Sequence, residues 1–220
     1  MLDILICPEL KIVCPEIILG CIQAQVQVES SSDALWKEIN DHCDTLKQEV
    51  QLEEIAALSK IQNGREVYKK LGKAPSKYRL SSEALLRRVL QGKGVYKVNN
   101  IVDINNLISL KSMFPVGSYN VKNLHSPISL LVGKKGEQYK GIGKEFISIE
   151  NLPVLTDGRG SFGSPTSDSE RAMITSDVKE IVMCIYSFSG IKNMEEYLQY
   201  AGELLERHAY GNKVKTKIVQ

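Results

Sequence analysis

The stretch SKYRLSSEALLRRVLQGKGVYKVNNIVDINNLISLKSMFPVGSYN, residues 76–120, decides the fold. It predicts two helices separated by a short loop that contains glycine. In the first helix, leucines and a valine between positions 85 and 90 form an apolar face, while Arg87 and Arg88 project from the other side. Ser81 or Ser82 is expected to cap this helix, because the free N–H groups of its first turn need an acceptor.

The second helix of this stretch is expected to lie in the core. Its predicted buried stripe consists of Ile101, Ile104 and Ile108. Asn99 or Asn100 is expected to cap it, and Asp103 falls in its first turn, where a negative charge suits the helix dipole. Pro115 and Gly117 close the unit.

The run VNNIVDINN, residues 98–106, resembles the hallmark of the B3/B4 domain of the phenylalanyl-tRNA synthetase β subunit. That hallmark typically reads N-N-V-V-D-V-T-N and follows an arginine-bearing helix and a glycine turn. The resemblance continues, more weakly, to about Val182 and covers roughly half of the chain. It implies an α+β fold that is layered β/β/α, with antiparallel-rich sheets and central helices. It also implies a free-standing B3/B4 protein, because the remaining residues leave no room for the other modules of a synthetase.

The resemblance also implies an editing pocket, which would hydrolyse the ester between a wrong amino acid and a tRNA end. Counting back from Thr175 to the family's Gly-Gly-Glu places the catalytic glutamate at Glu170, which would orient a water. The alternative for Glu170 is a surface ion pair with Arg171 or a nearby lysine. The family's histidine is Gly117 here, a position that we expect to offer only backbone and space. Any hydrolysis should therefore be slow. The expected pocket residues are Asn106, Gly117, Ser118 and Arg171.

The charges of the chain are unevenly distributed, although the formal net charge is only +2. Between Lys60 and Val98 there are eleven basic residues and two acidic ones, whereas residues 33–54 hold seven acids and two lysines. A concentrated positive field favours a polyanionic partner, and the alternative is an ordinary solvated face. The candidates for phosphate contact are Arg79, Arg87, Arg88, Lys93 and Lys97. Replacing Arg87 and Arg88 is expected to weaken RNA binding and to leave thermal stability nearly unchanged.

The second helix of the opening stretch carries a polar group that has two interpretations. A step of three or four residues brings Asp103 beside Asn106, and Asn105 beside Ser109. Buried amides must be hydrogen-bonded, so we expect this group to lock the helix onto neighbouring backbone. Direct RNA contact is the alternative.

The remaining sequence predicts further strands and helices within one B3/B4-like domain, with residues 1–60 as N-terminal strands and a long helix, 61–190 as the B3/B4 core and 191–220 as the C-terminal helix. The predicted strands include residues 4–6, 12–13, 17–19, 23–28, 128–132, 146–149 and 181–186. Residues 158–163 are expected to form a hairpin connection, and the alternative is a ligand-facing loop. The long helix should run from about Ser30 to Leu58, and Asn63-Gly64 should mark a break before a shorter helix. Asn193 should cap the last helix and Gly211 should end it.

Composition favours a cytoplasmic protein without cofactor, metal or membrane partner. No apolar run approaches the roughly 18–20 residues that cross a bilayer. The five cysteines lack C-x-x-C spacing and are expected to be reduced, and the three histidines lie in separate segments.

These observations lead to one principal function and two alternatives. The principal function is an RNA-binding module that recognises tRNA or an aminoacyl-tRNA end. The alternatives are a trans-editing aminoacyl-tRNA deacylase and an amino-acid or small-molecule binding protein.

Overall fold

Two four-stranded sheets form one half of the molecule in the computed structural model, which describes residues 1–220. The first sheet has the order β1 (Ile4–Ile6), β4 (Ile128–Val132), β7 (Pro153–Asp157) and β8 (Gly160–Gly163). The second has the order β10 (Asn212–Val219), β2 (Ile18–Gln25), β9 (Glu180–Ser187) and β3 (Val116–Asn120). Only the β1–β4 pair is parallel. A separate hairpin pairs β5 (Gln138–Lys140) with β6 (Phe146–Ser148).

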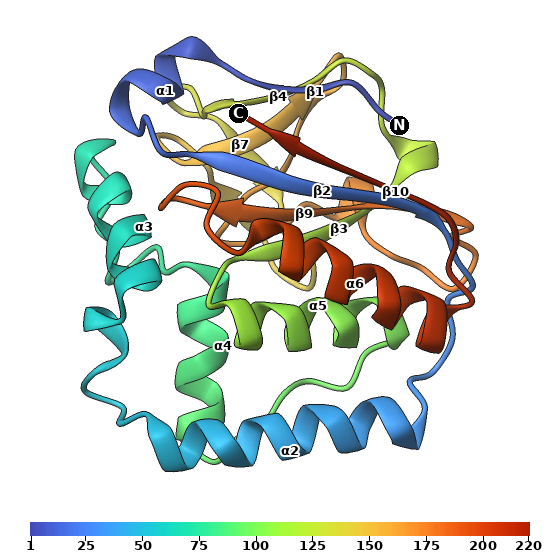
Figure 1. The fold of residues 1–220 in the computed structure, drawn as a ribbon. Coiled ribbons are helices and arrows are strands. Elements are labelled where there is room, and N and C mark those ends of the chain that lie inside the picture. Colours follow the sequence, from blue (N-terminus) through green and yellow to red (C-terminus); the bar gives the residue numbers. More distant parts are fainter.

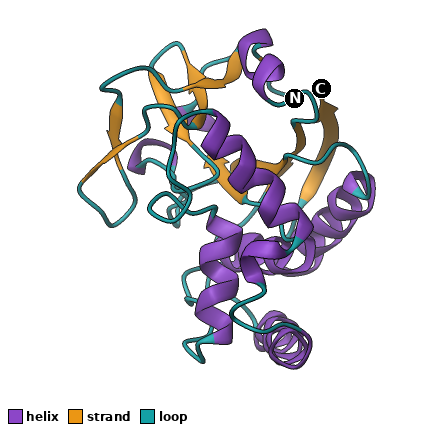
Figure 2. Cartoon of the chain, turned by 90° about the vertical axis from the view of Figure 1, so that its left-hand side faces the viewer, coloured by secondary structure: helices purple, strands orange, loops and turns teal.

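The helices are α1 (Pro8–Val13), α2 (Asp33–Glu49), α3 (Ser59–Lys70), α4 (Ser81–Leu90), α5 (Asn100–Ser112) and α6 (Met194–Ala209). Most of them lie on the other side of the second sheet, whereas the short α1 packs against β4 of the first sheet (Figure 1). In Figure 1, α5 and α6 lie beneath the second sheet, and α2 forms the outermost layer below α5. Figure 2 looks along α2 and shows most of the helices below the strands, with a short helix at the top beside the N-terminus. The predicted α+β fold and its β/β/α layering are confirmed.

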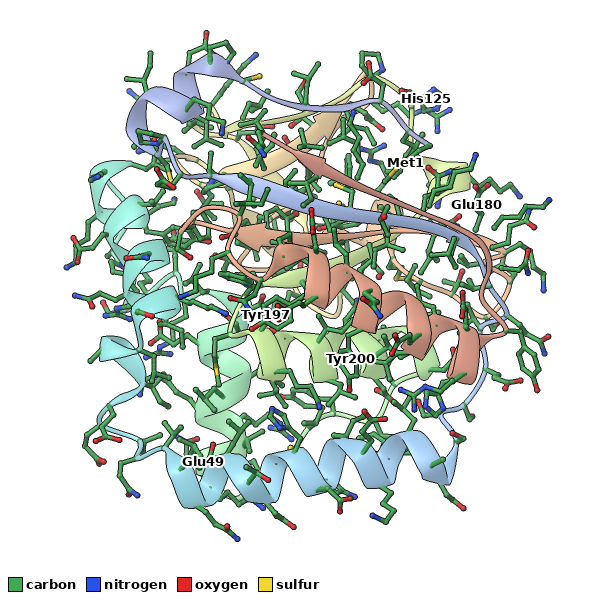
Figure 3. The ribbon with its side chains drawn as sticks, in the orientation of Figure 1. Met1, Glu49, His125, Glu180, Tyr197 and Tyr200 are labelled. Atoms are coloured by element: carbon green, nitrogen blue, oxygen red, sulfur yellow. The ribbon has the colours of Figure 1, made fainter.

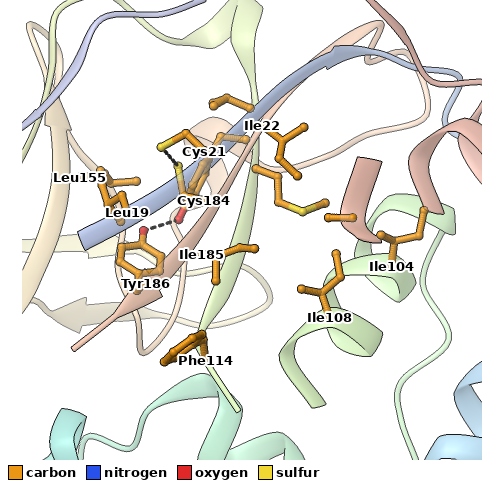
Figure 4. Packing of buried hydrophobic residues seen from close by; sticks show 14 of the residues in the cluster. Leu19, Cys21, Ile22, Ile104, Ile108, Phe114, Leu155, Cys184, Ile185 and Tyr186 are labelled. Carbon is orange, nitrogen blue, oxygen red and sulfur yellow. Dashed lines mark hydrogen bonds between the residues drawn. The ribbon is translucent and has the colours of Figure 1, made fainter. Parts of the chain in front are cut away.

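Helix α5 lies at the centre because almost every side of it is buried. The predicted stripe of Ile101, Ile104 and Ile108 is fully buried, and Figure 4 shows Ile104 and Ile108 pointing toward the sheet that carries Ile185. One cluster of 55 buried apolar residues joins both sheets and the helices. The central helix therefore serves as a rigid platform, and its exposed positions are few.

Several predicted elements are confirmed with small shifts at their ends. The strands β4, β6 and β9 and the C-terminal helix α6 lie where the sequence predicted them. Two expectations need correction: residues 160–163, expected within a connection, form the strand β8, and residues 212–219, expected within the C-terminal helical segment, form the strand β10. Asn99 caps α5 by accepting a hydrogen bond from the N–H of Val102 at 3.0 Å. Helix α4 has no side-chain cap, which corrects the expectation for Ser81 and Ser82. The Ser81 N–H instead donates to the Pro165 carbonyl at 2.7 Å.

The N-terminal predictions were wrong at two places. Residues 12–13 belong to α1 rather than to a strand, because Pro8 at the first helical position favours a helical turn. The long helix α2 begins after its cap Ser32 and already ends at Glu49. The chain then continues through a short 3-10 turn at Ile55–Ala57.

The predicted break at Asn63-Gly64 is also wrong, because α3 runs through it without interruption. Gly64 is buried against Leu80, and a β-carbon on Gly64 would lie 2.5 Å from a methyl group of Leu80. A glycine inside a helix costs roughly 0.5–1 kcal/mol relative to alanine. Here close packing of the helix against the segment before α4 outweighs that cost.

Candidate functional site

A cleft of about 480 Å³ opens between α4 and α5, and we call it the α4–α5 cleft. Four of the five cations predicted to contact phosphate line it, together with the predicted pocket residue Asn106. The lining includes Arg79, Arg87, Arg88, Lys93, Tyr96, Asn106 and Thr166. No aspartate or glutamate lines the cleft. The arrangement therefore concentrates positive charge in a concave surface, where field lines are focused.

A buried carboxylate holds two of the cleft arginines in place. Glu83 is fully buried in α4, and both of its oxygens accept hydrogen bonds from Arg65 at 2.9 Å. Arg87 donates to the same carboxylate at 3.0 Å, and the Arg79 guanidinium lies 3.9 Å from it. One negative charge thus meets three positive ones, which leaves a positive excess at the cleft. Because Arg87 supports a buried ion pair, the expectation that its removal leaves stability unchanged needs correction.

Arg88 is held differently, by an aromatic ring. Its guanidinium carbon lies 3.7 Å from the ring centroid of Tyr96, a cation–π distance. It makes no ion pair, and its buried Nε has no hydrogen-bond partner. Tyr96 is 60% exposed. The pair therefore presents an unneutralised charge and a flat, accessible aromatic surface in the same place.

The motif residues at the start of α5 fix the loop that carries Tyr96. Asn100 donates to the carbonyls of Gln27 and His208, both at 2.9 Å, and accepts from the N–H of Glu29 at 3.1 Å. Asp103 accepts from the Val98 N–H at 3.1 Å and from the hydroxyl of Ser31. Burial raises the pKa of the Asp103 carboxyl. The asparagine–aspartate motif thus ties Val98, two residues after Tyr96, to the N-terminal segment.

Asn105 and Asn106, the next polar positions of the motif, have different surroundings. Asn105 is buried and accepts a hydrogen bond from the Ser118 hydroxyl at 2.8 Å, whereas Asn106 lines the cleft. Ser109 donates to the Phe114 carbonyl at 2.8 Å and also borders the cleft. The hydrogen bonds of Asp103, Asn105 and Ser109 thus fit the structural interpretation, whereas Asn106 borders the cleft.

The segment 164–168 reaches the cleft through one residue, Thr166. Thr166 lines the cleft and shares a hydrogen bond of 2.8 Å with the hydroxyl of Tyr68. Behind it, Asp168 accepts from the Tyr119 hydroxyl at 2.9 Å and from the Ser164 N–H at 3.2 Å. Burial raises the pKa of Asp168 to about 7. The segment is therefore held by a hydroxyl–carboxyl network that the sequence did not predict.

Gly117 faces this interior network rather than open space. A β-carbon at Gly117 would overlap the Tyr119 hydroxyl and would lie 3.0 Å from an Asp168 oxygen. Gly163 approaches the same tyrosine from the other side, and the Tyr119 hydroxyl also meets that of Tyr186 at 2.8 Å. The expectation that Gly117 offers space is wrong, because the Tyr119 side chain occupies that space.

Glu170 and Arg171 are both engaged in ion pairs away from the α4–α5 cleft. Glu170 lies 3.1 Å from the ammonium of Lys140, and neither residue lines the cleft. Arg171 forms a bidentate pair with Asp157 at 3.0 and 3.1 Å and donates to the Gly160 carbonyl at 2.8 Å. The ion pair lowers the pKa of Asp157 against the opposing effect of its burial. The sequence-predicted catalytic and pocket residues are therefore not brought together at one place.

The other candidates lie apart from the cleft. Lys97 points to Trp36, with its ammonium 5.5 Å from the ring centroid. His125, one of the three histidines, does not line the cleft, and Figure 3 shows it near Met1, on the opposite side of the molecule from Glu49 at the end of α2. No group of three or more histidine, cysteine or acidic side chains is placed to hold a metal ion. None of the helices combines the length and the apolar character that a bilayer-crossing segment requires.

Sequence reasoning missed two residues of the cleft. Tyr96 stands between Lys93 and Lys97 in a glycine-bearing loop, and an aromatic residue among basic ones is a usable signal for nucleic-acid binding. Thr166 comes from a segment some seventy residues further along the chain, and nothing near it in the sequence indicates that it meets α4.

Comparison with known proteins agrees with this architecture. A structure described as an N-terminal fragment of the phenylalanyl-tRNA synthetase β subunit from Pyrococcus horikoshii shares the fold, with a TM-score of 0.51 and 14% identity. The match covers 99% of this chain and 54% of that one, so the chain spans about half the length of this neighbour. No curated protein matches the sequence. The family model described as B3/4 domain matches residues 63–217, and the chain therefore belongs to the B3/4 domain family.

Proposed function

We propose that this protein is an RNA-binding module that receives tRNA, or the aminoacylated end of a tRNA, in the α4–α5 cleft. The observation that carries the proposal is the lining of the cleft, which combines four cationic side chains with no carboxylate. Proteins that bind single-stranded nucleic acid combine a basic groove with aromatic side chains on which bases stack. Tyr96 on Arg88 supplies such a surface.

The roles of the cleft residues follow from how each is held. Arg87 is oriented by the buried Glu83 carboxylate, and a guanidinium in a fixed position suits bidentate recognition of a phosphate. Lys93 is exposed and unpaired, so it can follow a flexible backbone. Asn106 offers an amide that donates and accepts, which suits a base edge or a ribose hydroxyl.

Transfer RNA is the favoured class of RNA because of the family. The fold neighbour is a fragment of a tRNA synthetase subunit, and this relationship supports a tRNA-related partner. The cytoplasm is the compartment in which we propose that this encounter occurs.

The two alternatives have less support. A deacylase that uses Glu170 would need this carboxylate at the bound ester, but Glu170 pairs with Lys140 outside the cleft. A small molecule would fit in about 480 Å³. Four cations without a carboxylate favour a ligand with several negative charges instead.

Fluorescence anisotropy with labelled tRNA tests the proposal. Lys93→Ala should weaken binding, because it removes an unpaired cation from the cleft. Lys37→Ala is the matched control, since Lys37 lies on α2 and is paired with Asp41 at 2.6 Å. Equal affinities of the wild type and both variants would exclude the cleft as the RNA site. If the wild type hydrolyses aminoacyl-tRNA and the Glu170→Gln variant does not, the deacylase alternative would be supported instead.

A further inference from the structure

The segment between α3 and α4 concentrates positive charge, and we call residues 69–79 the basic connector. Its sequence, KKLGKAPSKYR, contains five cations and no acid. All of the cations are exposed except Lys73, which is half-buried. The proposed function uses only Arg79, the last residue of the connector, because Arg79 lines the α4–α5 cleft. The lysines of the connector therefore have no role so far.

The backbone of the basic connector is fixed by hydrogen bonds. Gly72 has a φ of +84°, and the next N–H, that of Lys73, donates to the carbonyl five residues back at 2.8 Å. This is the Schellman arrangement, in which a glycine in the left-handed region ends a helix. Further along, the Ala74 carbonyl accepts from the Lys77 N–H at 3.0 Å. The cations are therefore carried on an ordered turn.

Tyr78 brings two of these lysines to one place. The Lys73 ammonium lies 4.1 Å from the centroid of the Tyr78 ring, and the Lys77 ammonium lies 5.5 Å from it. Both are cation–π distances. Two positive charges are thus held beside one half-buried ring, although like charges repel.

Acids from neighbouring elements pair with the two ends of the basic connector. Glu66 pairs with Lys69 at 2.7 Å, and the Arg79 guanidinium lies 3.9 Å from the buried Glu83. The charge of the connector is therefore partly compensated at its first and last residues.

Two further acids leave the middle of the connector uncompensated. Glu16 borders the same hollow as Lys70. Glu150, on the loop that packs beside the connector, accepts a hydrogen bond from a backbone N–H at 3.0 Å. Lys73 and Lys77 form no ion pair. These two ammonium groups therefore lack a neutralising partner within the protein.

Charge without exposed apolar surface selects the class of partner. None of the exposed large apolar side chains of this chain lies between residues 13 and 95. Protein partners need an apolar core in the interface, and membrane-binding surfaces insert apolar side chains among the lipids. A nucleic-acid backbone can be bound by charge alone, because neutralised phosphates release their counterions. The basic connector therefore fits a nucleic-acid backbone.

The chemistry of the connector favours a duplex over a single strand. Sites for single strands offer aromatic faces on which bases stack, whereas the Tyr78 ring faces the Lys73 ammonium. Duplex RNA keeps its bases stacked inside and is recognised mostly through its shape and its phosphate and ribose groups. Ammonium groups alone suit such a backbone.

We propose that the basic connector is a contact surface for duplex RNA, in which Lys73 and Lys77 each neutralise a backbone phosphate. The connector's own charges and its lack of exposed apolar side chains favour a duplex backbone, and only the choice of RNA over DNA rests on the proposed function.

The salt dependence of binding to two RNAs separates this proposal from the proposed function. The probes are a blunt RNA duplex of about sixteen base pairs and a single-stranded trinucleotide, with binding measured by fluorescence anisotropy. For the duplex, Lys73→Ala/Lys77→Ala should make the slope of log affinity against log salt shallower by about 1.8, at about 0.9 per duplex phosphate. This variant should bind the trinucleotide like the wild type. Lys73→Arg/Lys77→Arg should keep the wild-type slope, because both charges remain.

Lys37→Ala/Lys47→Ala is the matched control, because it also removes two lysines, each of which is paired with an acid on α2. If the wild type does not bind the duplex, or if Lys73→Ala/Lys77→Ala keeps the wild-type slope, the connector proposal is overturned and the cleft proposal is unaffected. If the slope falls as expected while Lys93→Ala changes the affinity for neither RNA, the connector proposal stands and the cleft proposal fails. Loss of binding to anionic vesicles with an unchanged RNA slope would assign the connector to a membrane and overturn the proposal.

Discussion

Two polar clusters lie on opposite sides of the segment 164–168, and they differ in what surrounds them. The α4–α5 cleft is open, basic and lined by arginines whose charges exceed the available carboxylates. The interior cluster around Tyr119, Tyr186 and Asp168 is closed and nearly free of cations. An excess of charge next to solvent can attract a ligand, whereas hydroxyls that bond to one another fill space and fix the backbone.

The residues that the resemblance placed in one pocket are divided between the cleft and the interior of the protein. The resemblance implied one pocket that contains Asn106, Gly117 and Ser118. In the structure Asn106 opens to the cleft, whereas Gly117 and Ser118 belong to the interior. Loss of the family's histidine did not leave a vacancy, because the Tyr119 hydroxyl lies against Gly117.

The largest effect should follow removal of the carboxylate that supports the cleft. Glu83→Ala should lower the free energy of unfolding by about 3–5 kcal/mol, because Arg65 and Arg87 would lose a buried partner. Urea unfolding measures the change. Glu66→Ala is the control, since Glu66 forms an exposed pair with Lys69 that contributes about 0–1 kcal/mol. Equal losses in the two variants would mean that the cleft does not depend on Glu83.

Adding an atom beside the interior cluster should lower the stability of the fold. Gly117→Ala should cost about 1–3 kcal/mol, because the new methyl group must displace the Tyr119 ring or its hydroxyl. Gly158→Ala is the control, since a β-carbon on Gly158 would meet nothing within 4 Å. Thermal unfolding of both variants gives the comparison. A stable Gly117→Ala protein would show that the space beside Tyr119 is open after all.

Asp168 should make the interior cluster sensitive to pH. Its folded pKa of about 7 lies above the ordinary value of 3.8, so the folded state keeps a proton that the unfolded state loses between these values. The free energy of unfolding should therefore fall as pH rises from about 4 to 7, by at most about 1.4 kcal/mol per pH unit for this proton. Above pH 7 this contribution should level off.

Asp168→Asn removes the titration and keeps an oxygen that accepts from Tyr119 and Ser164. The stability of this variant relative to the wild type should increase between pH 4 and 7 in urea unfolding. Asp177→Asn is the control, because Asp177 is exposed and its pKa is lowered by the Thr175 hydroxyl. Parallel pH profiles of the wild type and Asp168→Asn would rule out the raised pKa.

The layered fold was expected from the resemblance to the B3/B4 domain, and most of its elements were predicted because local signals marked them. Apolar periodicity marked α5, and a run of apolar residues marked β9. The predicted break at Gly64 was wrong because the reason for a glycine at this position is tertiary packing. Leu80 packs where a side chain on residue 64 would stand. Charge density located four cleft cations, but it could not show that Arg87 is paired and Arg88 is stacked.

The central claim is that Arg88 and Lys93 meet phosphates in the α4–α5 cleft, and the salt dependence of tRNA affinity tests it most directly. Each single-strand phosphate that the protein neutralises contributes about 0.7 to the slope of log affinity against log salt. The double variant Arg88→Ala/Lys93→Ala should therefore have a slope that is shallower by about 1.4, with little loss of stability, because neither side chain is ion-paired. A double variant that folds and keeps the wild-type slope would contradict the claim.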